Sequence, residues 1–455
     1  MKTVGIVAEY NPLHTGHRYH IEESKNVTGA DAAIVVMSGA CVQRGGWASF
    51  GKSFRAACAV HAGADLVLEL PYPYSGQSAE TFADGAVRIL TRAGADTLCF
   101  GSEAGSLSGI TEAAQILAEE PEYYREELKN GLSSGLSFPA AREKAVAAFS
   151  PAAAAVLASP NNILGVEYLK AILKNKSRGY PSAGNNASEN RGPMEAFTIR
   201  RIGADYHQGS LSGAFASASA IRKALETTDH VKLDQAAAFL PYQKLSADAG
   251  VSVPELIRGS LMVPDTRNQF TAAASRLLTM TEEELLAYPG TGGGLAGRLL
   301  RSAGNSSAGM AGMLQKNIRD YDPGRGLDDL IRDVKTRQQT WTAIERTLTA
   351  LLMNVTREQL AVFMQPDYVP YLRVLAMNRK GREILRNLKQ QEVPVIGTPS
   401  TGTALLTEPQ KACWTLESRA CDLQSLLCRK PVQPLYSNDY GCGSNMRTVP
   451  LYLDV

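Results

Sequence analysis

Three of the six histidines of this chain fall within residues 14–20, at His14, His17 and His20. They follow an apolar run over 3–9 and a turn signal at 11–12, and they begin a stretch with helical periodicity. The N-terminus of a helix offers free backbone N–H groups and the positive end of the helix dipole, and imidazoles add further donors. We therefore predict that His14 and His17 bind a phosphate group at the start of the first helix.

The neighbours of these histidines support a nucleotide site. Thr15 is a residue type that caps helices, and Gly16 removes a side chain where a ligand would approach the backbone. His20 lies one turn beyond His17 on the same side of the helix, so we expect a structural role for it. The H-x-G-H pattern alone also arises by chance, but its place directly after the first strand favours a site. A zinc site is not expected, because a third ligand at suitable spacing is lacking.

A second motif lies two hundred residues later, where the pattern S-x-S-x-I-R opens a helix with Ser217, Ser219 and Arg222. Hydroxyls, N–H groups and a guanidinium at a helix start suit the oxygens of a polyphosphate. The alternative is a simple serine cap beside a solvated arginine, and on its own that alternative is the simpler one.

Alternating strand and helix patterns predict the fold that must position these residues. Such alternation is typical of an α/β fold with a Rossmann-like, doubly wound parallel sheet. The strands are predicted over 3–9, 32–37, 65–70, 97–101 and 196–199, and helices between them include 52–62 and 79–93. Ligands of open α/β sheets bind at the carboxyl ends of the strands, so these ends should converge on His14 and His17.

Length and composition limit the possible classes of protein. A chain of 455 residues can form two or three domains, and we predict a nucleotide-binding catalytic domain over 1–225 and a mainly helical domain over 226–455. A net charge of +2 gives no overall nucleic-acid signal, so any such surface must be local. Neither a signal peptide nor a membrane-spanning run is expected, which favours the cytoplasm. The seven cysteines form no C-x-x-C pair and are expected to be reduced and mostly buried.

The two motifs together resemble the paired signatures of adenylyl-transferring HIGH-type nucleotidyltransferases. Over most of residues 1–225 the chain is similar to the bacterial tRNA(Met) cytidine acetate ligase family, and the similarity recurs at 371–375 and 380–385. The segments that carry the resemblance are 7–12, 36–39, 43–45, 65–71, 101–103 and 159–164. The chain departs from the family pattern at Gly51, where an acidic residue usually precedes the lysine, and its insertion over 177–193 is longer than usual.

The resemblance implies a two-step reaction. ATP and acetate would give acetyladenylate and pyrophosphate, and the acetyl group would then pass to the exocyclic amine (N4) of the wobble cytidine of elongator tRNA(Met). Catalysis of the first step then needs positioning and charge stabilisation and no covalent nucleophile. The predicted catalytic residues are His14, His17 and Lys52, and Mg²⁺ is the expected counter-ion of the phosphates.

The resemblance also implies a set of ATP contacts. These are Val7, Ala8, Glu9, Tyr10, Asn11, Pro12, Leu13, His14, Thr15, Gly16, His17, Arg18, Tyr19, His20, Gly101, Asn162, Arg200, Arg201, Ser217, Ser219 and Arg222. For Asn162 and its neighbour Asn161, the alternative is that they cap the helix that they begin.

A basic stretch over 371–389 is the candidate tRNA-binding region. Its cations are Arg373, Arg379, Lys380, Arg382, Arg386 and Lys389. A solvated helix face is the default interpretation, and an RNA substrate would favour phosphate contacts instead. Two other functions stay open on the sequence: a small-molecule adenylyltransferase, and a nucleotide- or RNA-binding protein without turnover.

Overall fold

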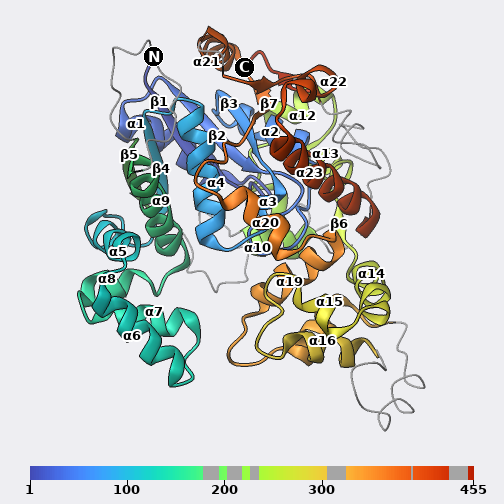
Figure 1. The fold of residues 1–455 in the computed structure, drawn as a ribbon. Coiled ribbons are helices and arrows are strands. Elements are labelled where there is room, and N and C mark those ends of the chain that lie inside the picture. Colours follow the sequence, from blue (N-terminus) through green and yellow to red (C-terminus); the bar gives the residue numbers. More distant parts are fainter. Residues whose placement is uncertain (178–193, 202–217, 226–234, 305–323, 391–392, 430–448) are drawn as a thin grey trace.

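The computed structural model describes residues 1–177, 194–201, 218–225, 235–304, 324–390, 393–429 and 449–455. Its main feature is an eight-stranded sheet with the order β10-β7-β3-β2-β1-β4-β5, in which β8 also pairs with β7 (Figure 1). The first five strands are parallel to one another: β1 (Thr3–Ala8), β2 (Ala32–Ser38), β3 (Leu66–Leu70), β4 (Thr97–Ser102) and β5 (Glu195–Arg200). The predicted doubly wound parallel sheet is confirmed for this half of the chain.

Apolar strand residues alternate between two cores, one on each face of the sheet. Ile34 and Leu68 pack with the helices on one face, and their neighbours Val35 and Val67 pack with those on the other. All seven residues of β2 are buried, as expected for a central parallel strand that is covered on both sides. The sheet therefore holds the carboxyl ends of its strands in fixed relative positions.

Helices of the first 225 residues connect these strands. They are α1 (Thr15–Thr28), α2 (Lys52–His61), α3 (Tyr72–Ser75), α4 (Ala79–Arg92), α5 (Ser108–Glu119), α6 (Glu122–Ser133), α7 (Phe138–Ala147), α8 (Pro151–Val156), α9 (Pro160–Ser177) and α10 (Ala218–Leu225). The first two pack on one face of the sheet, and α4 and α9 pack on the other. Every helix predicted over this region is found, with ends that differ by a few residues.

The second half of the chain is mainly helical, as predicted. Its helices are α12 (Gln243–Ala249), α13 (Val253–Arg258), α14 (Thr266–Thr279), α15 (Glu282–Leu286), α16 (Leu295–Ala303), α18 (Leu327–Val334), α19 (Trp341–Met353), α20 (Arg357–Met364), α21 (Arg379–Gln390), α22 (Pro399–Gly402), η2 (Thr403–Leu405) and α23 (Glu408–Leu427). In the described residues, no helix is long and apolar enough to cross a membrane.

Strands of the second half extend the sheet of the first. The strand β7 (Leu372–Met377) pairs antiparallel with β3, and β8 (Val395–Ile396) and β10 (Leu451–Tyr452) pair with β7. A separate short ribbon joins β6 (Val263–Pro264) to β9 (Cys428–Arg429). The interpretation of residues 371–377 as part of a helix face was wrong, because this apolar run is a strand buried beside β3.

The antiparallel direction of β7 determines where α21 lies. This helix starts beside the residues that precede β2 and β3: Lys380 Nζ donates to the carbonyl oxygen of Asp31 (2.7 Å), and Asn378 N donates to that of Asp65 (3.0 Å). Figure 1 shows α21 at the top of the view, near the N-terminus. The basic helix therefore lies at the amino ends of the parallel strands, opposite to the ends that carry His14 and His17.

Candidate active site

The imidazole of His14, and not Thr15, caps the helix α1. His14 Nδ1 accepts a hydrogen bond from Gly16 N (3.1 Å), and His17 Nδ1 accepts one from His14 N (3.3 Å). The two histidines thus form a capping box, in which each satisfies a backbone donor at the helix start. The prediction that Thr15 caps this helix was wrong, because the extended residue before it already supplies an acceptor.

We predicted free backbone N–H groups at the start of α1, and this prediction was wrong, because these groups already donate hydrogen bonds within the protein. Thr15 N donates to the carbonyl oxygen of Phe239 (2.9 Å), and His17 N donates to that of His14 (2.8 Å). The N–H groups of His14 and Gly16 are taken by the capping box. A phosphate at this helix start would therefore be met by the imidazoles and by the dipole of the helix, and not by free backbone donors.

Both imidazoles are neutral near pH 7. Their rings stack with centroids 3.8 Å apart. Burial, together with Arg201 and Arg222, lowers the pKa of His14 to about 4; burial, with His14 and Arg201, lowers the pKa of His17 well below its usual value. Since each Nδ1 accepts a hydrogen bond, the hydrogen-bond pattern assigns the ring proton to Nε2. Each ring thus keeps one N–H donor that the capping box does not use.

Two neighbouring side chains enclose this pair. The ring of Tyr10 meets that of His17 edge-on, with centroids 5.1 Å apart, and its backbone has a left-handed φ of 46°. His20 lies on the same side of α1, and its buried Nε2 has no hydrogen-bond partner in the described part of the chain. Burial, with a contribution from Arg201, lowers the pKa of His20 to about 4.

The second motif reaches the first through Arg222 of α10. Its Nη1 donates to the carbonyl oxygen of Asn11 (2.6 Å), in the turn between β1 and α1, and its Nη2 contacts Ser219 Oγ (3.2 Å). The lowered pKa of His14 reports the same proximity, since Arg222 is one of its causes. The structure therefore brings together His14, Asn11, Ser219 and Arg222, while Ser217 lies outside the described residues.

The next group of predicted ATP contacts lies at the carboxyl ends of β4 and β5, beside β1 in the sheet. Arg200 ends β5 opposite Ser102, and Arg201 N donates to the carbonyl oxygen of Ser102 (3.0 Å). The side chain of Arg201 covers Gly101, where a Cβ would lie 3.2 Å from Arg201 Cγ. The glycine therefore leaves room for a guanidinium that also lowers the pKa values of the three histidines.

Asn162 holds the loop after β4 and does not cap α9. Its buried side-chain oxygen accepts from Glu103 N (2.9 Å) and Ala104 N (3.1 Å). In return the Glu103 carboxylate accepts from Asn162 N (2.9 Å) and from Asn161 Nδ2 (2.6 Å). The capping alternative for Asn161 and Asn162 was wrong, because both lie inside the first turn and Glu103 provides the acceptor there.

The other predicted ATP contacts follow the path from β1 into α1. Val7 and Ala8 form the partly exposed end of β1, and Glu9, also partly exposed, follows it. Leu13 is buried in the core below the turn. Arg18 points to solvent and pairs with Glu22 (2.8 Å). The turn residue Pro12 is buried, and Gly16 and Tyr19 are partly exposed. Contact of these residues with ATP stays a prediction.

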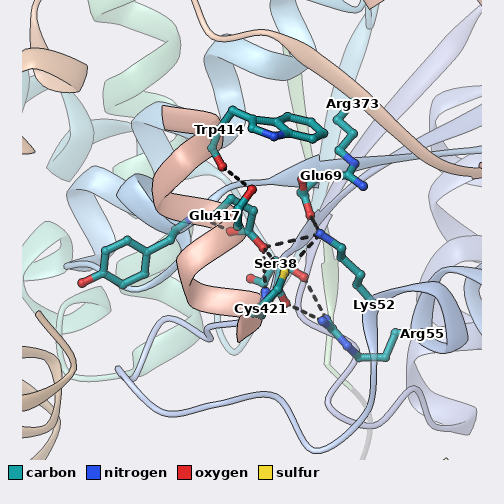
Figure 2. Close-up of polar contacts among 12 residues, drawn as sticks. Ser38, Lys52, Arg55, Glu69, Arg373, Trp414, Glu417 and Cys421 are labelled. Atoms are coloured by element: carbon teal, nitrogen blue, oxygen red, sulfur yellow. Dashed lines mark hydrogen bonds and ion pairs between the residues drawn. The ribbon is translucent and has the colours of Figure 1, made fainter. Parts of the chain in front are cut away.

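Lys52 lies in a buried cluster of ion pairs (Figure 2). Its Nζ is 2.7 Å from Glu69 Oε1 and 3.8 Å from Glu417 Oε1, and it also contacts Cys421 Sγ (3.4 Å). The Glu417 carboxylate accepts from Ala40 N (3.0 Å) and Tyr72 N (2.8 Å), which follow β2 and β3. These contacts give Lys52 a positioning role, and its catalytic role stays a prediction.

The cluster contains groups that the sequence analysis missed. Burial and the neighbouring Glu69 raise the pKa of Glu417 to about 7. Arg55 donates to the carbonyl oxygens of Glu9 (2.8 Å), Ser38 (2.8 Å) and Gly39, which joins the ends of β1 and β2. For Arg55, the only sign in the sequence was a cation within an otherwise mainly apolar helix pattern. Nothing near Glu417 in the sequence indicates its contacts with Ala40 and Tyr72, which lie 377 and 345 positions before it.

The predicted tRNA-binding cations separate into two groups. Arg373 is buried in β7, where its guanidinium stacks on Trp414 at 4.4 Å from the ring centre and faces Glu69 (3.6 Å). Its assignment to an RNA-binding surface was wrong, because the side chain has no exposed surface. The remaining cations, Arg379, Lys380, Arg382, Arg386 and Lys389, are exposed on α21.

A metal site built by protein ligands alone is not found among the described residues, where no group of three His, Cys, Asp or Glu side chains could hold an ion. A magnesium ion would instead be held largely by phosphate oxygens and water, with at most one or two carboxylates. The six described cysteines are free and buried, as predicted for reduced thiols.

Comparisons with known proteins agree with this geometry. A family model described as HIGH Nucleotidyl Transferase matches residues 1–438. The chain is 36% identical to the tRNA(Met) cytidine acetate ligase of Acetivibrio thermocellus, over 95% of this chain and 96% of that protein. It is 34% identical to the protein of the same name from Bacillus subtilis, over 88% of each. The chain belongs to the tRNA(Met) cytidine acetate ligase family of HIGH nucleotidyl transferases.

Solved structures of this family share the fold. A crystal structure of Thermotoga maritima TmcAL bound with alpha-thio ATP matches with a TM-score of 0.77 and 26% identity, and each chain is covered completely. The apo form of the same protein matches with a TM-score of 0.79. The resemblance stated from the sequence and the predicted fold class are confirmed.

The lowered pKa of His20 predicts how the stability of the protein depends on pH. The unfolded chain binds a proton at this histidine near pH 6.5 and the folded chain only near pH 4, so the free energy of unfolding should fall as the pH falls through this window. Between pH 6.5 and pH 4, the decrease in the free energy of unfolding should be smaller in His20→Gln than in the unmodified protein, by up to about 3 kcal/mol. Urea unfolding at several pH values measures it, and an unchanged slope in the variant would contradict the buried neutral imidazole.

Proposed function

We propose that the protein is an ATP-dependent ligase that activates acetate as acetyladenylate and transfers the acetyl group to N4 of the wobble cytidine of elongator tRNA(Met). The observation that carries this proposal is the bond from Arg222 to the carbonyl oxygen of Asn11, beside the stacked His14 and His17. It joins an imidazole pair and a guanidinium into one anion-binding site at the carboxyl end of β1. The names of related proteins include tRNA(Met), cytidine and acetate, and a related structure is bound with alpha-thio ATP, which support these substrates.

In the first step, ATP lies across the carboxyl ends of β4 and β1. The nucleoside binds beside Gly101, Asn162 and Arg201, and the α-phosphate faces the Nε2–H donors of His14 and His17. Ser219 and Arg222 hold the β- and γ-phosphates, with Mg²⁺ as their counter-ion. An acetate oxygen attacks the α-phosphorus in line, and pyrophosphate leaves.

Neutral imidazoles suit this step for an electrostatic reason. They donate hydrogen bonds to the charge that develops on the α-phosphate, and no proton has to be moved when that charge appears. Arg201 and Arg222 supply the full positive charges that an anionic substrate requires. Burial is the main cause that keeps the imidazoles neutral; Arg201 adds to it for both rings and Arg222 for His14. The site is thus arranged to bind and orient, and none of its residues acts as a covalent nucleophile.

In the second step, the cytidine amine attacks the acetyl carbonyl carbon and AMP leaves. We propose that residues 1–225 carry the nucleotide chemistry and that 226–455 hold the tRNA. The cations of α21 are the proposed phosphate contacts. Since the strands rise about 3.3 Å per residue, a tRNA bound at α21 must reach across roughly 20 Å of sheet to place its base at His14 and His17.

The experiment that tests the proposed function follows radiolabelled acetate. Label should enter tRNA in acid-precipitable form only when ATP is present. Release of pyrophosphate without labelled RNA would instead indicate a small-molecule adenylyltransferase, and the absence of both would indicate a binding protein without turnover.

His17→Ala should abolish acetate-dependent release of pyrophosphate and leave tRNA binding within about twofold, because the residue faces the phosphate and not the RNA. Removing an oriented donor at the reacting centre costs about 100-fold to 1,000-fold in rate. His61→Gln is the matched control, since it removes an imidazole of α2 that is not among the predicted ATP contacts and should retain turnover. Unimpaired turnover in His17→Ala would remove this residue from the chemistry.

Replacing Arg382, Arg386 and Lys389 together by Ala should raise the KM for tRNA and reduce the slope of tRNA affinity against salt, because fewer cations neutralise phosphates. The KM for ATP should not change, because α21 lies at the amino ends of the parallel strands and the proposed ATP site lies at their carboxyl ends. Replacement of the exposed Lys129 and Lys144 on α6 and α7 is the control. An unchanged salt slope would discard α21 as the tRNA contact.

A further inference from the structure

The helix α19 brings a carboxylate from the second half of the chain to the carboxyl end of β2. It packs on residues 43–46, where Arg346 Nη1 donates to the carbonyl oxygen of Gln43 (3.4 Å) and Thr349 Oγ1 donates to that of Gly45. Gly45 has a φ of +103°, and a Cβ there would lie 2.6 Å from Arg346 N. This contact between loop and helix therefore requires glycine.

Glu345, the residue before Arg346, lies against the same loop. A Cβ built on Gly46 would lie 2.9 Å from Glu345 Oε1, so the carboxylate is in contact with the backbone there. The loop is tied in turn to β1, because Gln43 N donates to Glu9 Oε1 (2.6 Å). The carboxylate of Glu345 is thereby placed beside the carboxyl ends of β1 and β2.

The carboxylate of Glu345 is partly buried, and within the described part of the chain it makes no hydrogen bond or ion pair. The charged groups that act on it come from four elements: Asp328 of α18, Arg44 of the loop, Arg346 of α19 and Arg222 of α10. Burial, with Asp328, raises the pKa of Glu345 to about 7 against the opposing effect of the three arginines. A carboxylate in this state can accept a proton at neutral pH.

The order of the strands places this group beside the proposed site of the α-phosphate. In the proposed function, the nucleoside lies at β4 and the α-phosphate at β1, with His14. Since β2 is the next strand beyond β1, the loop 43–46 lies on the side of the proposed α-phosphate position that is away from β4. Glu345 lies against this loop, and Arg222, which binds the carbonyl oxygen of Asn11 in the same site, is one of the charges that act on it.

We propose that Glu345 is the base that takes the proton from the attacking amine in the second step, an inference that rests on the proposed function. The amine nitrogen forms a bond to the acetyl carbon, and the bond from this carbon to the phosphate oxygen breaks. AMP leaves with the electron pair of that bond. The proton that the nitrogen must lose passes to the Glu345 carboxylate and then to water.

A structural role for Glu345 would have a different signature. If it only supported the packing of α19 on the loop, its replacement would slow both steps alike. If it takes the proton of the amine, its replacement slows transfer to tRNA far more than the acetate-dependent exchange of pyrophosphate into ATP, which reports the first step alone.

The test measures both rates in the full chain, with exchange as one assay and single-turnover acetylation of tRNA as the other. In Glu345→Gln we expect transfer to fall about 100-fold more than exchange, which is the usual contribution of a general base. The transfer rate of the unmodified enzyme should rise with pH through about 7, because the base must be deprotonated, and the variant should lack this rise.

Asp328→Asn gives a second, independent readout. Removing this charge should lower the pKa of Glu345, and the rise of the transfer rate should move to lower pH without a loss of maximal rate. Equal losses of both rates in Glu345→Gln, or a pH profile that neither variant changes, would overturn the proposal. An unmodified enzyme that catalyses neither step would overturn the proposed function itself, so the two failures are distinguishable.

Discussion

The hydrogen bond from Arg222 to the carbonyl oxygen of Asn11 joins two segments that are two hundred residues apart in the chain. One segment carries the stacked imidazoles of His14 and His17, and the other carries a guanidinium and Ser219. Neither holds a phosphate convincingly alone, because the first lacks a fixed positive charge and the second resembles an ordinary helix start. Their contact makes a single site that can orient a triphosphate, and the proposed reaction depends on it.

The second half of the chain holds the loops that follow β2 and β3 in place next to this site. Glu417 of α23 binds the backbone after β2 and β3 and faces Lys52 (Figure 2). The strand β7 extends the sheet beside β3. Removing one partner from a buried ion pair leaves a charge uncompensated, at a cost of about 3–5 kcal/mol. The carboxyl ends of the strands, where we propose that substrates bind, are therefore held in place by residues from both halves of the chain.

Local patterns in the sequence were sufficient for the parallel sheet and for the position of the histidines. Strands such as Ala32–Ser38 are apolar throughout and end in polar residues, so their type and limits follow from composition alone. The capping of α1 was not predictable in this way: Thr15 has the usual chemistry of a cap, but the extended backbone at His14 placed an imidazole nearer to the donors. Which residue caps a helix depends on the backbone geometry of the preceding turn.

Contacts between distant segments account for the other differences. Arg373 looked like part of a basic surface because charge alone does not reveal burial, and its pairing with Glu69 and Trp414 requires β7 to lie beside β3. Asn162 looked like a helix cap, yet the loop after β4 supplies Glu103 to the same helix and uses the asparagine in return. Each of these roles follows from a partner that lies tens or hundreds of residues away.

The central claim, that one ATP molecule spans the two motifs, is tested most directly by calorimetric binding of ATP and AMP. If Arg222 holds the β- and γ-phosphates, the unmodified protein should bind ATP more tightly than AMP, and Arg222→Met should reduce this ratio about tenfold or more, as expected for a lost charge-assisted hydrogen bond. Lys223→Met, which removes an exposed cation from the same helix, should leave the ratio unchanged. If the ratio of ATP affinity to AMP affinity is the same in Arg222→Met as in the unmodified protein, the account is contradicted.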